Sequence, residues 1–312
     1  MDRFREMETF VAVVEAGSFV GAGESLRVSK AAVSRSVQEL EARLGARLLQ
    51  RTTRRLSLTE AGRAYYARSK QILADVEEAD GAVGAVTGQP VGQLRVNVPF
   101  SFGLRHLAPL WGKFLARYPG IELDVSLNDR LVDLVEEGYD LAVRITRMAD
   151  SSLVSRRLAS TRVLFCASPE YLAEHGHLKR LADVTRHAVI GYSYSQFGDL
   201  WRLTRRDGVE EEALTRPRLR ANNGDTCRAA ALAGQGIALL PTFLIGEDLH
   251  AGRLVPVLPD YPPPELGIYA VYPSRKHLSL KVRVLLDFLA EAFAEVSWAG
   301  CDAQAGASER AR

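Results

Sequence analysis

A short glycine- and proline-rich segment, GQPVG at residues 88–92, divides the sequence into two parts with different hydrophobic periods. Before it, apolar residues recur at the three- and four-residue spacing of helices. After it, short apolar runs typical of strands alternate with helical patterns, which favours α/β architecture with largely parallel sheets. The length of 312 residues is about twice that of a usual domain, so we expect two folded units.

The first part begins with three short predicted helices. Gly17 ends the first, and Ser18 is suited to cap the second, which ends near Leu26. Ser29 is suited to cap the third, and Gly45 supplies its C-terminal stop. The apolar stripe of this third helix is formed by Val33, Val37, Leu40 and Leu44. Three short helices in a row, the last with one apolar face, are typical of a helix-turn-helix unit.

A predicted hairpin and a long helix follow. Leucines flank a polar, basic tip at 51–55, which indicates a β-hairpin, or wing. Thr59 resembles an N-cap for a helix that runs to about Val86. Its heptad register, which predicts a seam with a second copy of the chain, consists of Tyr65, Ser69, Ile72, Val76, Ala79 and Val83.

Positive charge is concentrated in the same region. The chain has a net charge of only +2, but residues 27–70 hold eleven Lys or Arg against three acidic residues, a local net charge of +8. The face of the third helix opposite its apolar stripe carries Ala31, Arg35 and Gln38, with Lys30 and Ser34 on its flanks. Arg and Gln match the edges of guanine and adenine in the major groove. An ordinary solvated helix face is the alternative, but the preceding turn, the charge and the wing arginines Arg51, Arg54 and Arg55 favour a winged reader of double-stranded DNA.

The run from METFVAVVEAGSFVGAG to RRLSLTEAG, residues 7–62, is similar to the N-terminal signature of the LysR-type transcriptional regulators. LVDLVEEGYDLAVRI and GQGIALLP also resemble the effector domain of that family. The resemblance implies a winged helix-turn-helix, a long dimerisation helix and a two-lobed α/β effector domain like a periplasmic binding protein. It further implies control of transcription by a small effector, homo-oligomers that are dimers or tetramers, and RNA polymerase as a further partner.

These considerations divide the chain into segments. We expect a DNA-binding domain at 1–62, a linker helix and hinge at 63–92, an effector domain at 93–297 and a disordered tail at 298–312. The lobes are expected at 93–165 with 268–297, and at 166–267, joined by crossover strands near 161–166 and 267–272. Predicted strands are 94–99, 121–127, 141–145, 161–166, 188–192, 218–221, 237–240 and 267–272, and predicted helices include 103–118, 130–137, 169–175, 225–233 and 279–296.

Polar clusters follow several predicted strands, where α/β domains usually bind ligands. The effector site is predicted to be lined by Ser101, Phe102, Asn128, Arg144, Tyr192, Trp201, Asn222, Asn223 and Tyr269. Ser101, Asn128 and Asn222 have the alternative role of helix caps, and Arg144 that of an ion-pair partner of Asp140 or Glu136. Aromatic residues with one or two cations suggest a small effector that is aromatic or carries a carboxylate.

Other classes of function are less well supported. Cys166 and Cys227 leave a thiol-based redox sensor as an alternative, although no CxxC pair occurs. Motifs of nucleotide-binding, zinc or serine enzymes are absent from the sequence, so we expect neither catalytic residues nor a metal or cofactor. An architectural DNA-binding protein would not need the long second part. The uncharged run 229–246 is broken by glycines and a proline, so it is interpreted as helix, turn, buried strand and turn rather than a membrane span, and a cytoplasmic, nucleoid-associated protein is expected.

Overall fold

The computed structural model describes residues 2–51, 56–87, 89–147, 154–273, 278–296 and 298. The chain divides into two compact units, the first formed by the residues up to Gly92 with Val135–Gly138, and the second by Gln93–Leu134 and the residues from Tyr139 onward. No helix in the part of the chain that is described is both long and apolar enough to cross a membrane. Each unit has its own hydrophobic core.

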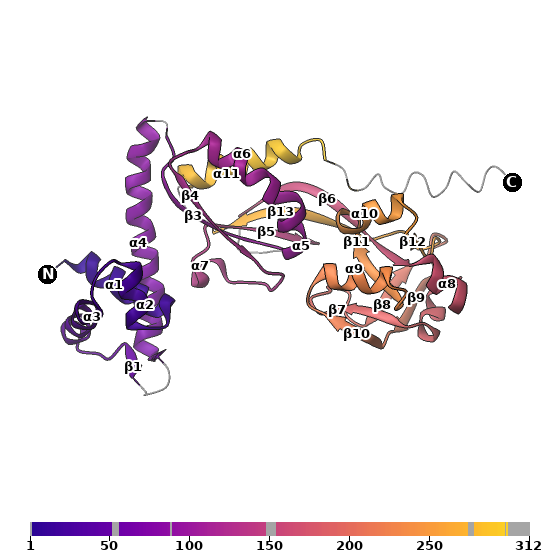
Figure 1. Cartoon of the computed structure of the whole chain (residues 1–312), viewed down its shortest axis with the longest axis horizontal. Helices are drawn as coiled ribbons and strands as arrows, with labels where there is room; N and C mark the ends of the chain where they lie inside the picture. Colours follow the sequence, from indigo (N-terminus) through magenta and orange to yellow (C-terminus); the bar gives the residue numbers. More distant parts are fainter. Residues whose placement is uncertain are drawn as a thin grey trace. The chain divides into compact units, whose positions relative to one another are not determined.

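Three short helices form the body of the first unit: α1 (Arg3–Ala16), α2 (Phe19–Ser25) and α3 (Lys30–Leu44) (Figure 1). Their caps are the ones that the sequence predicts. Ser18 Oγ accepts a hydrogen bond from Gly21 N–H, Ser29 Oγ accepts one from Ala32 N–H, and Gly45 ends α3 with a φ of 63°. Val33, Val37 and Leu40 are fully buried, but Leu44 is 37% exposed, so its place in the buried stripe was predicted wrongly.

The basic segment after Gly45 folds as the predicted hairpin. Strands β1 (Leu49–Arg51) and β2 (Leu56–Leu58) pair in antiparallel register. Thr59 then caps α4 (Glu60–Thr87), because its hydroxyl oxygen accepts from Gly62 N–H at 2.9 Å and donates to the Arg47 carbonyl at 2.7 Å. The cap therefore joins the hairpin to the long helix.

Some residues of the predicted dimer seam along α4 contact other parts of the same chain. The Tyr65 ring lies 5.6 Å from that of Phe10 in α1, and Ser69 is 1% exposed. Assigning Ser69 to a seam with a second copy was therefore wrong, because it is buried inside the unit. Tyr65 is half-buried, and its place in the seam stays a prediction. Ile72 is half-buried and Val76 is 38% exposed, whereas the side chains of Ala79 and Val83 lie outside the described residues.

A mixed sheet forms the centre of the second unit, with strand order β10-β7-β11-β6-β13-β5-β3-β4 and β12 paired to β6. Its strands are β3 (Gly92–Val98), β4 (Ile121–Leu127), β5 (Leu141–Thr146), β6 (Val154–Ala167), β7 (Val189–Tyr192), β10 (Pro217–Ala221), β11 (Ile237–Pro241), β12 (Val255–Pro256) and β13 (Glu265–Tyr272). β3 is parallel to β5, and β7 is parallel to β10 and β11. The centre is antiparallel, because β6 and β13 run opposite to each other and to β11 and β5. The prediction of largely parallel sheets was thus wrong at the centre.

Strand β6 belongs to two groups of strands. Its first part, up to Arg162, pairs with β13, and its second part, from Val163, pairs with β11 and β12. The chain returns beside this point, where Val163 N–H donates to the Pro264 carbonyl at 2.9 Å. We call residues 93–162 with 265–296 the first lobe, and residues 163–264 the second lobe. The return at Pro264 lies a few residues before the predicted crossover at 267–272.

Helical segments pack on these strands (Figure 1). They are α5 (Phe100–Phe102), the π-helical turn η1 (Gly103–Leu107), α6 (Ala108–Arg117), α7 (Leu134–Glu137), α8 (Pro169–His175), η2 (Leu181–Arg186), α9 (Gly224–Leu232), α10 (Thr242–His250) and α11 (Leu280–Phe293). α6 and α11 meet through Phe114 and Phe288, whose rings are 5.2 Å apart. The core side of α11 is the apolar stripe that begins at Val282 and ends at Phe293.

Several elements differ from the sequence-based prediction. α10 occupies a segment interpreted as a turn after Pro241, and α7 covers only the end of the predicted helix 130–137. The hairpin of β8 (Leu200–Thr204) and β9 (Glu210–Leu214) was not predicted, because charged residues interrupt its alternation. Trp298 was assigned to a disordered tail, but its ring lies 4.8 Å from His106 and 5.6 Å from Phe102. That assignment was wrong at Trp298, and residues 299–312 lie outside the described residues.

Gly62 tests the junction between hairpin and long helix. A β-carbon at this position would lie 2.0 Å from the Leu48 carbonyl oxygen, a backbone atom to which the N–H and the hydroxyl of Thr59 both donate. Gly62→Ala should therefore lower the free energy of unfolding of the first unit by about 1–3 kcal/mol, measured by urea unfolding. The control Gly112→Ala in α6 meets no atom within 4 Å and should stabilise by about 0.5–1 kcal/mol. Equal effects of both substitutions would contradict the close approach.

Candidate nucleic-acid interface and ligand cavity

The exposed face of α3 is the candidate nucleic-acid interface in the first unit. Lys30, Ala31, Arg35 and Gln38 are exposed and Ser34 is half-exposed, while the apolar stripe of the same helix is buried. The predicted set therefore lies together on one side of one helix. Arg51 has no described side chain, and Arg54 and Arg55 lie outside the described residues, so the wing part of the prediction rests on the sequence.

Two carboxylates hold α3 in place behind this face. Glu6 of α1 is 4% exposed and accepts from Arg43 Nε at 2.8 Å and Nη2 at 2.6 Å. This hydrogen bond raises the pKa of Arg43. Glu41 accepts from the N–H groups of Leu48 and Leu49, at 2.7 and 3.0 Å. The polar face of α3 is thus presented by a helix that is tied to α1 and to the first strand of the hairpin.

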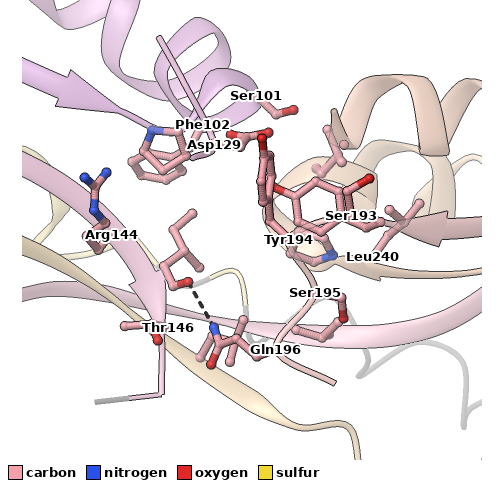
Figure 2. A pocket seen from close by; sticks show the side chains of 18 of the residues that line it. Ser101, Phe102, Asp129, Arg144, Thr146, Ser193, Tyr194, Ser195, Gln196 and Leu240 are labelled. Atoms are coloured by element: carbon pink, nitrogen blue, oxygen red, sulfur yellow. Dashed lines mark hydrogen bonds between the residues drawn. The ribbon is translucent and has the colours of Figure 1, made fainter. Parts of the chain in front are cut away.

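The candidate ligand site is a cavity of about 610 Å³ between the two lobes of the second unit. Pockets for small organic ligands have volumes of this order. The first lobe contributes residues that follow β3 and β4 and the end of β5 itself, and the second lobe contributes the loop after β7 together with β11 and the start of α10. Its apolar walls include Phe102, Ile145, Leu239, Leu240 and Phe243. Figure 2 shows Arg144 and Phe102 on one side of this space and Tyr194 and Leu240 on the other.

Five of the predicted effector residues line the cavity, namely Ser101, Phe102, Asn128, Arg144 and Tyr192. The structure also decides between their alternative roles. Ser101 lies inside α5 and is not its N-cap. The side chain of Asn128 accepts from Arg130 N–H at 2.8 Å, which closes a turn rather than caps a helix.

The other four predicted residues do not line the cavity, so these assignments were wrong. Trp201, on the unpredicted strand β8, is 4% exposed and packs 4.9 Å from Phe165 in the core of the second lobe. Asn223 caps α9 by accepting from Thr226 N–H, and Asn222 is exposed. Tyr269 lies opposite Arg144 in the β5–β13 register, but its ring covers Gly267 and packs with the group that contains Leu134, Ala142 and Val271.

Sequence reasoning missed other lining residues. Asp129 stands beside Asn128 in the polar cluster after β4, and the loop 193–197 follows β7, so the rule that ligands bind at the carboxyl ends of strands would have identified both. Leu240 and Phe243 also line the cavity. They look like ordinary core residues in the sequence, because only the packing of the lobes leaves space beside them.

Arg144 extends from β5, and its direction is set by a neighbouring strand. Its Nη1 donates to Asn97 Oδ1 at 2.7 Å and lies 3.3 Å from the Val143 carbonyl oxygen. Asn97 is fully buried on β3. Asp140, one suggested partner of Arg144, instead accepts from Arg95 N–H at 2.9 Å and lies 3.5 Å from Lys281 Nζ. Arg144 is therefore a cation with a fixed orientation at the wall of the cavity.

Asp129 supplies a carboxyl group after β4. Its Oδ1 accepts from Phe100 N–H at 2.7 Å, at the start of α5. Burial raises the pKa of Asp129, although the Phe100 N–H and the Tyr192 hydroxyl favour its charged form. Burial and the neighbouring Asp129 also raise the pKa of Tyr192. Asp129 thus binds its proton more tightly than an ordinary exposed aspartate.

Side chains of described residues connect the lobes on two sides of the cavity. On one side, Arg105 of η1 donates to Asp225 of α9 at 2.5 Å, and His106 Nε2 lies 3.0 Å from the Phe243 carbonyl oxygen, to which it donates. On the other side, Gln196 Nε2 donates to the Ile145 carbonyl at 3.4 Å (Figure 2), and Gln196 Oε1 accepts from Arg147 N–H at 3.3 Å. The loop that carries Gln196 therefore reaches from the second lobe to the end of β5 in the first.

Comparison with known proteins identifies both units. Residues 4–63 match the family model of the bacterial regulatory helix-turn-helix protein, lysR family, and residues 87–294 match that of the LysR substrate binding domain. The chain belongs to the LysR family of transcriptional regulators. An HTH-type transcriptional regulator of Haemophilus influenzae is 39% identical to this LysR-type regulator over 282 residues, which are 90% of this chain and 98% of the relative.

Solved structures agree with this assignment. CrgA, a LysR-type transcriptional regulator from Neisseria meningitidis, is 37% identical with a TM-score of 0.59, and the match covers 94% of this chain and 99% of CrgA. A full-length variant of AphB is 28% identical with a TM-score of 0.68, over 93% of this chain and 99% of that protein. The likeness thus extends over both units, and this LysR-type regulator is a DNA-binding transcriptional regulator.

Asp129 predicts a pH dependence of stability in this LysR-type regulator. Because the pKa of Asp129 is raised in the folded protein, the native state binds this proton more tightly than the unfolded chain does. The free energy of unfolding therefore falls as the pH rises from the ordinary aspartate pKa of about 4 through the raised pKa of the folded state. Asp129→Asn keeps an oxygen acceptor for Phe100 N–H but has no ionisable proton, so its stability should not fall with pH for this reason. The stability of the variant relative to wild type should therefore be greater at about pH 8 than at about pH 4, measured by urea unfolding.

The exposed residue Asp124 on β4 supplies the control for this experiment. Asp124→Asn removes the same charge without the buried position. A pH-independent difference between Asp129→Asn and wild type, or the same difference for Asp124→Asn, would contradict the environment described for Asp129.

Proposed function

We propose that this LysR-type regulator reads a specific operator sequence with α3 and the wing, under the control of a small effector bound between the two lobes. The observation that carries the proposal is the polar face of α3, formed by Lys30, Ala31, Ser34, Arg35 and Gln38. Arg and Gln can donate to and accept from base edges in the major groove, and the small Ala31 allows close approach. Arg51, Arg54 and Arg55 of the wing supply positive charge for phosphates.

The cavity supports control by an effector. It has the volume of a small-molecule site, mostly apolar walls and a few oriented polar groups, which is the usual composition of such sites. A ligand in it touches both lobes, so binding favours whichever arrangement of the lobes gives it more contacts. A ligand that binds one arrangement of the lobes more tightly than another shifts the protein toward that arrangement. Such a shift can change operator binding or contact with RNA polymerase, which we propose as a further partner.

The long helix α4 supports assembly into dimers or tetramers. The next two positions of the heptad register after Ser69 are Ile72, which is half-buried, and Val76, which is exposed. Both have surface that a second copy could cover. LysR regulators form oligomers, and a twofold pair of α3 helices would read two half-sites. We place the protein in the cytoplasm, at the nucleoid, where operators are found.

The described cysteines do not favour a redox sensor. Burial raises the pKa of Cys166 to about 12 and that of Cys227 to about 11. Their exposed fractions are 0% and 1%. Oxidants react with cysteines that are deprotonated and exposed to solvent, and Cys166 and Cys227 are neither readily deprotonated nor exposed.

Arg35→Ala tests base reading by α3. Loss of a bidentate contact to a base should weaken binding to the cognate operator by about 1–3 kcal/mol and binding to random DNA by much less. The measurement is fluorescence anisotropy with both DNAs at one salt concentration. Arg68→Ala, an exposed position on α4, is the charge-matched control and should not change the ratio of the two affinities. Equal loss on both DNAs in Arg35→Ala would reject base reading.

A double substitution tests pairing through α4. Ile72→Asp with Val76→Asp would place carboxylates along the proposed seam, where burial of unpaired charge is unfavourable. Light scattering should report monomers. Ala67→Asp, exposed on α4 and away from the register, should leave the oligomer intact. An oligomer that persists in the double variant would show that pairing uses another surface.

A further inference from the structure

The positions of the charged groups in the cavity restrict the chemistry of the ligand. This inference rests on the proposed function, because it concerns the same site. Among the described residues, three charged ones line the cavity: Arg144, Asp129 and Arg130. Arg130 is exposed, whereas Arg144 and Asp129 are half-buried. Charges that are removed from water interact more strongly, so Arg144 and Asp129 dominate the recognition of a bound ligand.

These two residues belong to strands that are not neighbours in the sheet. Arg144 is on β5, and Asp129 follows β4, with β3 between the two strands. Adjacent strands are roughly 4.8 Å apart, so two steps across the sheet separate the positions by roughly 10 Å. The cavity therefore has a cationic end beside β5 and an acidic end beyond β4. A ligand that lies between them meets opposite charges at its two ends.

Each end is built by neighbouring residues. Arg144 is directed by the buried Asn97, which accepts from its Nη1. An arginine held in this way presents a planar set of donors that matches a carboxylate. At the other end, Asp129 is fixed by Phe100 N–H, which donates to its Oδ1 at 2.7 Å. A second anionic group on the ligand would be repelled at this end.

The middle of the cavity is apolar. Ile145 of the first lobe and Leu239, Leu240, Phe243 and Leu244 of the second lobe face it. Burial of apolar surface there is worth roughly 25 cal/mol per Å², so a hydrocarbon or aromatic body is favoured over a sugar or a polyol. The volume of about 610 Å³ leaves space for a body of more than one ring.

We infer that the cavity selects a compact apolar monocarboxylate, with its carboxylate on Arg144, its hydrocarbon body between the lobes and a far end that is not anionic beside Asp129. Dicarboxylates of the same shape are disfavoured by Asp129, beside which their second carboxylate would lie. Neutral amides of the same shape lose the charge-assisted hydrogen bonds to Arg144. The bound carboxylate also lies beside Thr146 and the loop of Gln196, where that loop joins the lobes.

The test uses the full-length protein and three ligands of one shape: 2-naphthoate, 2-naphthamide and naphthalene-2,6-dicarboxylate. Isothermal titration calorimetry at constant ionic strength should give millimolar or tighter binding for 2-naphthoate. The amide and the dicarboxylate should each bind at least about tenfold more weakly. Equal binding of the amide would overturn the role of charge, equal binding of the dicarboxylate would overturn the role of Asp129, and no binding of 2-naphthoate would overturn the inference as a whole.

Variants locate the binding. Arg144→Gln should weaken 2-naphthoate binding at least about tenfold and leave 2-naphthamide binding unchanged. Arg144→Lys keeps the charge but not the planar donors, so it should weaken 2-naphthoate binding less than Arg144→Gln does. Arg157→Gln is the charge-matched control, because Arg157 forms an exposed ion pair with Glu265 and does not line the cavity. Thr146→Trp, which fills the cavity from the end of β5, should abolish binding of every ligand. Unchanged 2-naphthoate binding in Arg144→Gln or in Thr146→Trp would overturn the inference.

The outcome is separable from that of the proposed function. Operator reading is measured with Arg35→Ala and no ligand, so its failure does not depend on these titrations. If 2-naphthamide binds as well as 2-naphthoate and Thr146→Trp removes both, the cavity remains a ligand site and only the monocarboxylate class is wrong.

Discussion

The second unit depends on one shared strand. β6 pairs with β13 up to Arg162 and with β11 from Val163 onward, so a single backbone ladder belongs to both lobes. The returning chain crosses beside it, where Val163 N–H bonds to the Pro264 carbonyl. Two adjacent crossings hold the lobes together while permitting small rotations about them. The cavity exists because the lobes join at these strands and diverge beyond them.

Polar contacts across the cavity then set how closely the lobes approach. The Arg105–Asp225 pair is partly shielded from water, with a distance of 2.5 Å, whereas the bonds of Gln196 are exposed and 3.3–3.4 Å long. Short charge-assisted bonds are stronger than long neutral ones, so the two connections differ in strength. A ligand that contacts Arg144 and the loop 193–197 acts on the weaker connection.

In the first unit, α3 is held in the fold by polar contacts while its basic residues remain exposed. The buried carboxylate of Glu6 is paired with Arg43, whose guanidinium still reaches water. Glu41 and Thr59 tie the ends of the hairpin to the neighbouring helices. The charges used for folding are thus buried or paired, and those of the reading face remain in water, where phosphates can reach them.

Local signals in the sequence determined the elements that depend on neighbouring residues. Ser18, Ser29, Gly45 and Thr59 act within one helical turn, so the caps and the order α1 to α4 follow from the chain itself. The same holds for most strands of the second unit and for the polar residues that follow β3 and β4. Tertiary structure alone decided that Tyr65 packs on α1, that Ser69 is buried, that Trp201 enters a core and that Tyr269 covers Gly267. It also decided that Leu240 and Phe243 face a cavity, because whether an apolar side chain meets a neighbour, a partner or an empty space depends on residues far away in the sequence.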